Sequence, residues 1–211
     1  MSNYYLATDT ETGGFNENTA DLLTAYFAIL DENYQLIEEL DLKLKPNDGR
    51  LPIAEAGALK VNGINLKAHL EDINTISYKD GAEKVTNLIK KYLKKKGRYS
   101  NILLFGYNVG FDKRWLQKYL IPQDIWESMI HYKDVDVMQA VDFLKRAGWL
   151  PKELGTLATV VKYFEISVLN AHTAKGDVLM TIDVEKKLIE LMKSKKEGGG
   201  SVDLIALLEQ E

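Results

Sequence analysis

A change in hydrophobic periodicity at the turn Pro46–Gly49 restricts the fold more than any other feature of the sequence. Before it, three short runs have the character of β-strands: Tyr4–Thr8, Thr24–Asp31 and Tyr34–Lys45. In the third run leucine alternates with charged residues, which is the period-two pattern of a half-buried strand. Glu32–Asn33 separates the second run from the third and favours a tight hairpin. This part of the chain therefore predicts a three-stranded antiparallel meander.

After the turn, helical patterns alternate with two short strands, Ile102–Phe105 and His131–Asp136. Helices are expected at 53–60 and 77–96, from Asn108 onward, and at 137–147, 154–164 and 174–192. Ser77, Asn108 and Asp136 are predicted N-caps, because their side chains can accept hydrogen bonds from the first helical N–H groups. The element order predicts a mixed five-stranded sheet with helices on its faces, a three-layer α/β domain.

Composition limits the class of protein. The 211 residues are 45% hydrophobic and 27% charged, which predicts one folded domain and excludes disorder of the whole chain. No apolar stretch is long enough to span a membrane, and no signal-like run opens the sequence, so we expect neither a membrane protein nor a secreted one. The absence of cysteine excludes disulfides and thiolate chemistry and is compatible with a cytoplasmic location. The net charge of −4 argues against a large duplex-binding surface.

The C-terminal segment differs from the rest of the chain. We expect a domain over 1–193, a flexible Gly/Ser linker at 194–201 and a short tail at 202–211. The tail is either an amphipathic helix that docks a partner, such as a polymerase or a clamp, or the remnant of a fusion. The sequence does not separate these two readings.

Acidic residues form the sharpest local feature. Asp9 and Glu11 are two residues apart at the expected end of the first strand, so their side chains point to the same side. Two such carboxylates repel each other unless a cation lies between them, and oxygen ligands favour Mg²⁺ or Mn²⁺ over zinc. Gly13–Gly14 follows and allows the backbone to approach a ligand closely. The alternative is a polar strand end that runs into a turn.

Two further acids lie at expected helix starts. Asp112 follows Asn108 within the first turn of a helix, where a carboxylate is favoured by the helix dipole whether or not it has a function. His172 lies in a loop five residues before Asp177, and its alternative is an ordinary surface histidine.

Together the three patterns occur in the order D-x-E, N-x₃-D and H-x₄-D. This arrangement resembles the DEDD (DnaQ-like) 3′→5′ exonuclease superfamily, in its histidine-bearing DEDDh branch, over Tyr4–Met192. The resemblance implies a ribonuclease H-like fold and two Mg²⁺ ions, with Mn²⁺ able to substitute. It implies a catalytic set in which four acids bind metal and the histidine acts as general base: Asp9, Glu11, Asp112, Asp177 and His172.

In our hypothesis Asp9 bridges the two ions, and Glu11 and Asp177 bind the ion that carries the attacking water. Asp112 acts mainly through water molecules on the second ion. His172 accepts the proton of that water, since a histidine titrates near neutral pH.

The implied activity is hydrolysis of phosphodiester bonds from the 3′ ends of single-stranded or frayed DNA, which releases nucleoside 5′-monophosphates; proofreading is one expected role. Two alternatives stay open: an exoribonuclease that trims RNA ends, and a non-catalytic interaction module recruited through 202–211. The sequence departs from the family at Leu22–Tyr26, which lacks a frequent glutamate, and at Tyr107, where a histidine often precedes the asparagine.

Candidate substrate contacts come from backbone near the acids, from a segment that ends in Gly-Ile like the family's base-contacting segment, and from the helix after Asn108. They are Thr10, Thr12, Gly13, Gly63, Ile64, Asn108 and Phe111. Phe15 is a further stacking candidate, whereas Phe111 has core packing against Trp115 as its alternative. The basic runs Lys90–Arg98 and Lys193–Lys196 are either a phosphate track or solvated helix faces, and His69 and His131 are expected to be structural or surface residues.

Overall fold

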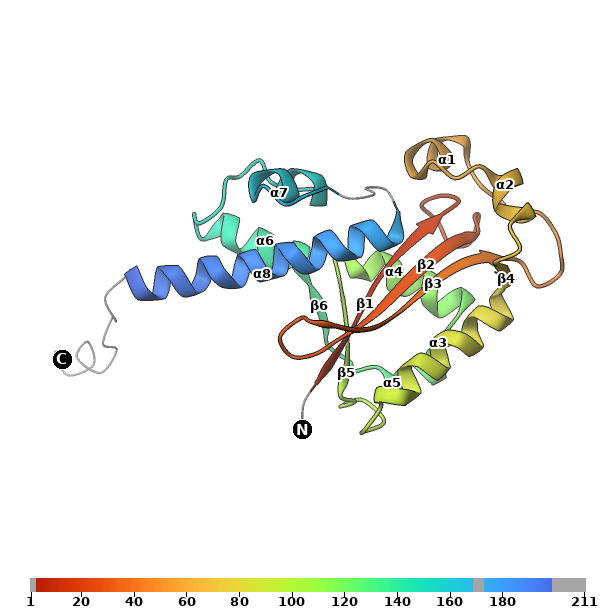
Figure 1. Ribbon diagram of the computed structural model, residues 1–211, viewed down its shortest axis with the longest axis horizontal. Helices are drawn as coiled ribbons and strands as arrows, with labels where there is room; N and C mark the ends of the chain where they lie inside the picture. The colour runs from red at the N-terminus through yellow and green to blue at the C-terminus, as the bar shows by residue number, and fades with distance from the viewer. Residues whose placement is uncertain (1–2, 169–172, 199–211) are drawn as a thin grey trace.

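The computed structural model describes residues 3–168 and 173–198, and a six-stranded sheet runs through its centre (Figure 1). The strands are β1 Tyr4–Thr12, β2 Leu22–Leu30, β3 Leu36–Lys45, β4 Thr75–Ser77, β5 Ile102–Gly106 and β6 Asp134–Asp136. Their order across the sheet is β4-β3-β2-β1-β5-β6. The expected count of five strands was wrong by one, because the short edge strand β4 was not predicted. The predicted linker began at 194, but residues 194–198 continue α8, and the rest of the linker and the tail, 199–211, lie outside the described residues.

The predicted meander is confirmed. β1 pairs with β2 and β2 pairs with β3, both antiparallel. The other three strands add in parallel, β5 beside β1, β6 beside β5 and β4 beside β3. The sheet is therefore mixed, as predicted. β1 continues to Thr12, so Asp9 and Glu11 lie inside the strand and not at its end, which corrects the expected boundary at Thr8.

The helices are α1 Ala56–Asn62, α2 Leu66–Glu71, α3 Tyr78–Tyr92, α4 Val109–Tyr119, α5 Gln123–Met129, α6 Val137–Arg146, α7 Leu157–Tyr163 and α8 Ala174–Gly198. α2 and α5 were not predicted. Ser77 and Asp136 cap α3 and α6 through their side chains, as predicted. Asn108 lies at the N-cap position of α4, as predicted, but its backbone is left-handed (φ 57°) and its side chain makes no capping hydrogen bond, so the expected contact was wrong.

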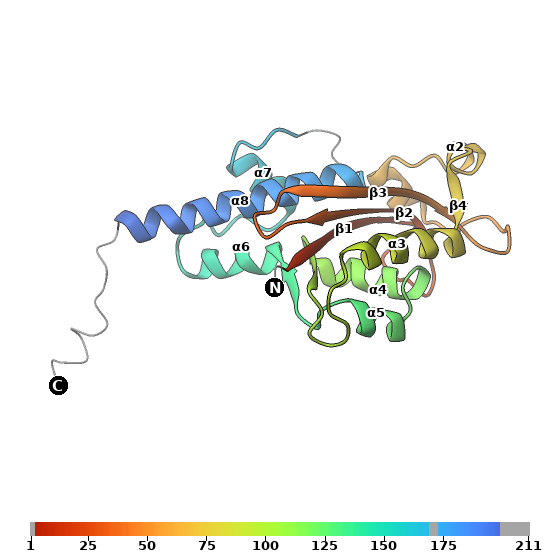
Figure 2. The same cartoon turned by 60° about the horizontal axis from the view of Figure 1, so that its bottom comes forward.

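Helices cover both faces of the sheet, which confirms the three-layer architecture (Figure 2). On one face α3, α4 and α5 enclose a core that includes Leu6, Phe27, Leu104, Trp115 and Leu116. On the other face α6, α7 and α8 enclose a core that includes Ala7, Tyr26, Phe105, Val141 and Val178. Successive residues of β1 thus point to opposite cores, as a strand requires. Within the described part of the chain, no helix has both the length and the apolar surface needed to cross a membrane.

Candidate active site

The site forms where β1 extends past its parallel neighbour. β5 pairs with the first half of β1, from Tyr4 to Ala7, and ends at Gly106. β1 continues for five more residues, and α4 begins beside this overhang at Val109. Gly106 permits the close turn, since a Cβ atom there would lie 3.0 Å from the carbonyl oxygen of Thr8. The fold therefore brings the start of α4 next to the acidic half of β1.

Three carboxylates meet at this overhang. Asp9 and Glu11 lie two and four residues after Ala7 in β1, so their side chains point to the same face of the sheet as Ala7, the face covered by α8. Asp177 lies in the first turn of α8, and its backbone N–H donates to the carbonyl of Thr173 (2.9 Å). Oxygen atoms of the three carboxylates lie within 4.8 Å of one another. Among the described residues, this is the group of acids whose spacing suits a bound metal ion.

Asp112 approaches from the other face. It has only 3% of its surface exposed, and its Oδ1 accepts a hydrogen bond from the hydroxyl of Thr10 (2.7 Å). Thr10 lies four residues after Leu6 in β1, so its side chain points to the same face of the sheet as Leu6, toward α4. Thr10, a candidate substrate contact, therefore uses its hydroxyl to orient Asp112. Asp112 is close enough to raise the pKa of Asp9 by its charge, although it is not part of the compact group of three.

The clustering raises the pKa of these acids. Burial raises the pKa of Asp9 well above its usual value, and the three neighbouring carboxylates raise it further. Burial and the charges of Asp177 and Asp112 raise the pKa of Glu11 to about 8. Burial raises the pKa of Asp112 to about 7, although the hydrogen bond from Thr10 opposes this. Acids in this state hold protons near neutral pH unless a cation replaces them.

The donor set fits a hard divalent cation. All of the donors are carboxylate oxygens, which suit Mg²⁺ and Mn²⁺, and no cysteine is present to favour a softer metal. Three half-buried acids from two elements supply the negative charge that such an ion would neutralise. His172, the candidate general base, lies outside the described residues.

A groove of about 590 Å³ opens beside Glu11. Gly63 and Ile64 also line this groove, together with Asn62, so the structure brings these two candidates to the same groove as the acid. Asn62 was missed by sequence reasoning. Its Nδ2 donates to the carbonyl of Thr12 (3.2 Å), and its Oδ1 accepts from the N–H of Ile64 (3.0 Å). The Asn-Gly pair that ends α1 was the available signal.

Thr12 and Gly13 use their polar groups in hydrogen bonds within the protein. The hydroxyl of Thr12 donates to the carbonyl of Gly14 (2.7 Å). The N–H of Gly13 donates to the carbonyl of Asp21 (2.8 Å), and its own carbonyl accepts from the N–H of Glu55 (2.7 Å). A Cβ atom on Gly13 would lie 2.3 Å from the carbonyl oxygen of Ile53. Gly13 is thus required for close packing of the 53–55 segment on β1.

A buried ion pair fixes the same segment. Asp21 has 1% of its surface exposed and accepts from both terminal nitrogens of Arg50, at 2.5 and 2.8 Å. It also accepts from the N–H of Ile53 (2.6 Å) and the hydroxyl of Tyr119 (3.3 Å). Burial raises the pKa of this carboxyl, but the bonds from Arg50 and Ile53 outweigh it and leave the pKa below its usual value. This pair lies 29 residues apart in sequence and was not predicted.

The same contacts hold α1 in place. α1 buries none of its residues, so hydrophobic burial does not anchor this helix. Its attachment comes instead from the Asn62 bond to β1 and from the Asp21–Arg50 pair on the segment that leads into it. The wall of the groove is therefore positioned by polar contacts to the strand that carries Asp9 and Glu11.

The remaining candidates lie in different surroundings. Phe111 is partly buried and packs against Trp115, with ring centroids 6.1 Å apart, which agrees with the core alternative. Phe15 is 85% exposed in the loop after β1. The N–H of Asn108 donates to Oδ1 of Asp136 (2.9 Å), the acid that caps α6, so its backbone N–H serves the fold.

Two histidines outside the motifs have structural contacts. His69 is buried, and its Nε2 lies 2.9 Å from the carbonyl oxygen of Leu44. Nδ1 of His131 accepts from the N–H of Lys133 (3.0 Å).

The basic run Lys90–Arg98 lies at the far end of the sheet. Lys94 contacts the hydroxyl of Tyr4 at the start of β1 (3.3 Å), and Lys91 pairs with Glu38 (2.5 Å). Asp9 is five residues along β1 from Tyr4, a distance of about 17 Å. This position favours the interpretation of the basic run as a solvated helix face over its interpretation as a phosphate track that starts at the acids.

The fold is similar to solved structures of E. coli exonuclease I. A complex with a dT13 oligonucleotide has a TM-score of 0.70 and 23% identity, and the match covers 88% of this chain and 41% of that chain. A zinc-bound complex with single-stranded DNA has a TM-score of 0.71 and 21% identity, with coverage of 93% and 42%. A complex with SSB-Ct has a TM-score of 0.68 and 21% identity, again covering 93% and 42%.

This chain therefore spans about two fifths of the length of the proteins it matches, and the likeness shows the fold. No protein-family model matches the sequence, and no curated protein matches it.

Proposed function

We propose that this chain is a metal-dependent 3′→5′ exonuclease that acts on single-stranded DNA. The observation that carries the proposal is the group of three carboxylates, with oxygens within 4.8 Å of one another, at the overhang of β1 in a ribonuclease H-like sheet. The neighbours in fold are exonuclease structures, several of them bound to DNA oligonucleotides, and this supports the choice of substrate.

In this proposal Asp9, Glu11 and Asp177 bind divalent cations, and Asp112 joins them through water molecules. Two bound Mg²⁺ ions would supply an activated water and stabilise charge on the phosphate and on the leaving 3′ oxygen. Thr10 holds Asp112 in position through its hydroxyl. His172 takes the proton of the attacking water, a role that comes from the resemblance of its motif.

The groove beside Glu11 would receive the terminal nucleotide. Gly63 and Ile64 line it together with Glu11, and Asn62 fixes them to β1. Two lysines of the groove, Lys43 and Lys175, are paired with Asp72 (2.5 Å) and Glu39 (2.7 Å), so their charges are already balanced. Backbone and amide groups would therefore make most contacts to the terminal nucleotide.

The test is a gel assay on matched 5′-labelled DNA and RNA oligonucleotides, each with Mg²⁺, with EDTA and with the Asp9→Ala protein. We expect a metal-dependent ladder that shortens from the 3′ end of DNA and is absent for the variant. If RNA is shortened faster than DNA, the preferred substrate is RNA and not DNA. No shortening of either strand with Mg²⁺ or Mn²⁺ would contradict the proposed activity.

A role in proofreading, through recruitment to a polymerase or clamp by 202–211, is part of the same proposal. A protein truncated at Lys196 should keep its nuclease rate and lose binding to such a partner.

A further inference from the structure

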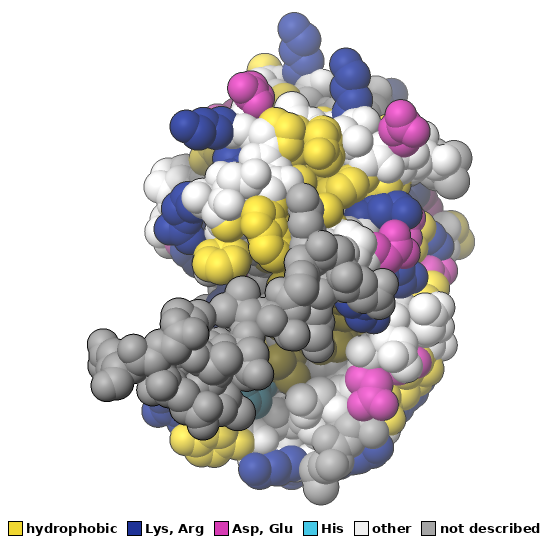
Figure 3. Space-filling model, turned by 90° about the vertical axis from the view of Figure 1, so that its left-hand side faces the viewer, with side chains coloured by type: hydrophobic (Ala, Val, Ile, Leu, Met, Phe, Trp, Pro, Cys, Tyr) yellow, Lys and Arg dark blue, Asp and Glu magenta, His cyan; other side chains and the backbone are white. Residues whose placement is uncertain are grey.

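The outer face of α6 carries an exposed aromatic residue among cations. The helix buries Val137, Val141 and Leu144 against the sheet. Its opposite stripe, at helical spacing, includes Phe143 and Arg146, and Phe143 is 59% exposed. Trp149, just after the helix, is 40% exposed. Figure 3 views the molecule from this side and shows hydrophobic side chains next to Lys and Arg side chains.

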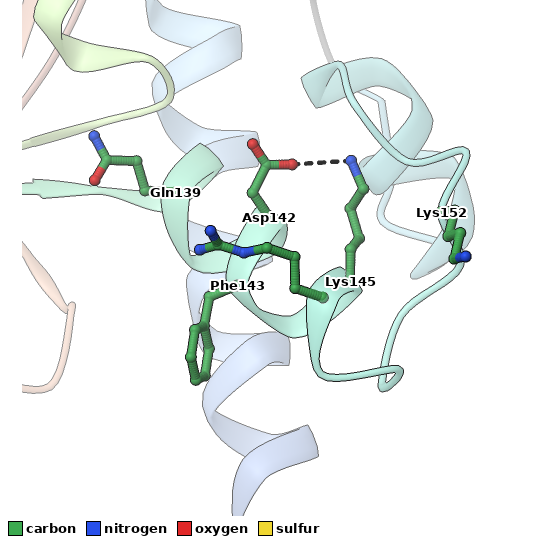
Figure 4. A pocket seen from close by; sticks show the side chains of 6 residues that line it. Gln139, Asp142, Phe143, Lys145 and Lys152 are labelled. Atoms are coloured by element: carbon green, nitrogen blue, oxygen red, sulfur yellow. Dashed lines mark hydrogen bonds and ion pairs between the residues drawn. The ribbon is translucent and has the colours of Figure 1, made fainter.

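A cavity of about 760 Å³ lies on this face, and we call it the α6 cavity. Its lining residues are Gln139, Asp142, Phe143, Lys145, Arg146 and Lys152. Three of them are cations and one is an anion. Lys145 donates to Asp142 (2.9 Å), and Figure 4 shows these two side chains pointing toward each other. Arg146 and Lys152 have no ion-pair partner among the described residues, so two positive charges remain for a ligand.

Two hydrogen bonds attach the elements that line the α6 cavity beside the start of α4. The hydroxyl of Tyr107 donates to the carbonyl of Gly155 (3.2 Å), which anchors the loop that carries Lys152 beside the start of α4. Asp136 accepts from the N–H of Asn108 and caps α6, so the helix itself starts at the same place. Arg146 is nine residues along α6 from its first residue, a distance of about 14 Å. The two elements that carry Arg146 and Lys152 are thus both attached beside the start of α4, the helix that carries Asp112.

We propose that the α6 cavity binds the part of a single-stranded DNA substrate that lies 5′ of the end held at the carboxylates. Arg146 and Lys152 contact phosphates, and Phe143 stacks on a base. An aromatic ring beside cations is the combination that binds single strands without regard to sequence. This inference rests on the proposed function for the identity of the substrate.

A competing occupant is the chain's own segment 202–211, which carries three acids: Asp203, Glu209 and Glu211. A strand of DNA matches the cavity better, because it supplies both phosphates for the cations and a flat base for the exposed ring of Phe143. The attachment of this loop and of α6 beside the start of α4 points the same way, since both elements then begin near the proposed active site.

The experiment uses the full chain and two variants matched in charge. The test variant is Arg146→Gln with Lys152→Gln. The control variant is Lys90→Gln with Lys96→Gln, two exposed lysines of the basic run at the opposite end of the sheet. The substrates are oligothymidylates of about 4 and about 16 nucleotides, the range of lengths that single-strand sites occupy.

For the test variant we expect KM to rise about tenfold on the long oligonucleotide and to stay unchanged on the short one, with kcat unchanged on both. Phe143→Ala should raise KM on the long oligonucleotide by a similar factor, through lost stacking. In binding measured by anisotropy in EDTA, the slope of log affinity against log salt should weaken by about 1.4 for the test variant, since each phosphate contact on a single strand contributes about 0.7. Neither change should occur in the control variant.

An equal rise in KM on the short and long oligonucleotides, or an equal rise in the test and control variants, would overturn the inference. Either result would leave the proposed nuclease activity itself standing. If the oligonucleotides are bound but never shortened, the proposed function fails, and the anisotropy measurement still decides about the cavity. Much tighter binding of DNA after removal of 199–211, with no weakening in the test variant, would make the acidic segment the occupant and overturn the inference.

Discussion

Replacing Glu11 by glutamine should stabilise the metal-free protein. Glu11 shares its surroundings with three other acids, and burial together with the charges of Asp177 and Asp112 raises its pKa from 4.5 to about 8. The folded protein therefore binds this proton more tightly than the unfolded chain does. Stability is greatest below the unfolded-state pKa and falls as the pH rises through the interval from 4.5 to about 8. Glutamine cannot ionise in either state and therefore removes this loss.

The magnitude follows from the same values. Neutral pH lies about 2.5 pH units above the ordinary pKa of a glutamate, and each unit corresponds to about 1.4 kcal/mol. The raised pKa of Glu11 thus costs the metal-free folded protein about 3 kcal/mol at pH 7, because the folded state must keep this proton while the unfolded chain releases it. For a chain of this size about 2–4 °C of Tm corresponds to each kcal/mol, so Glu11→Gln should raise Tm at pH 7 by about 6–12 °C.

The assay is thermal and urea unfolding in EDTA across the pH range from about 4.5 to about 8.5, for the wild type and for Glu11→Gln. Added Mg²⁺ should stabilise the wild type and have a smaller effect on the variant, which lacks one ligand. Glu83→Gln, an exposed acid of α3, is the control and should follow the wild type at every pH. A Glu11→Gln protein with the same pH profile as the wild type would refute the reasoning, because the four acids would then not be coupled as their positions require.

Further predictions concern the catalytic residues and the contacts that position them. Asp9→Ala should reduce nuclease turnover to near background in the gel assay, with folding unchanged by circular dichroism. His172→Ala should lower kcat by roughly 10²–10⁴-fold, and full activity in this variant would remove the general-base role. Arg50→Ala leaves Asp21 without its main partner and should cost about 2–3 kcal/mol in urea unfolding, less than for a fully buried pair because Arg50 is 43% exposed. Gly13→Ala places a Cβ atom 2.3 Å from a backbone carbonyl oxygen and should destabilise the protein by more than about 2 kcal/mol.

The sequence predicted the elements that carry a strong local pattern. The alternation of leucine and charged residues in β3 and the apolar run of β5 were visible without the structure, and so was the order of the sheet's first three strands. β4 was not, because the three residues Thr75–Ser77 carry no measurable period and form a strand only by pairing with β3. α5 likewise depends on burial of Trp126 and Met129 more than on its own sequence.

Contacts between distant residues were beyond sequence reasoning. Asp21 and Arg50 belong to no sequence motif, and only the fold brings these two residues together. Asn108 was expected to cap α4 because asparagine often does, but its backbone N–H is used by Asp136 and its conformation is left-handed. The acids of the candidate site were found because they occur in recognisable motifs. Apart from Thr10, the residues that position these acids belong to no motif.

Strand β1 places side chains of the candidate site on both of its faces. Its even positions, Thr8 and Thr10, point toward α4, and Thr10 orients Asp112 there. Its odd positions, Asp9 and Glu11, point toward α8 and meet Asp177. A slip of one residue would exchange the two sets and separate all four acids. β1 is paired on both sides, antiparallel with β2 and parallel with β5, so its register is fixed before any cation binds. The repulsion between the acids is thus opposed by a strand that β2 pairs along its length and β5 pairs over its first half, which is why we expect cation removal to lower stability without unfolding the protein.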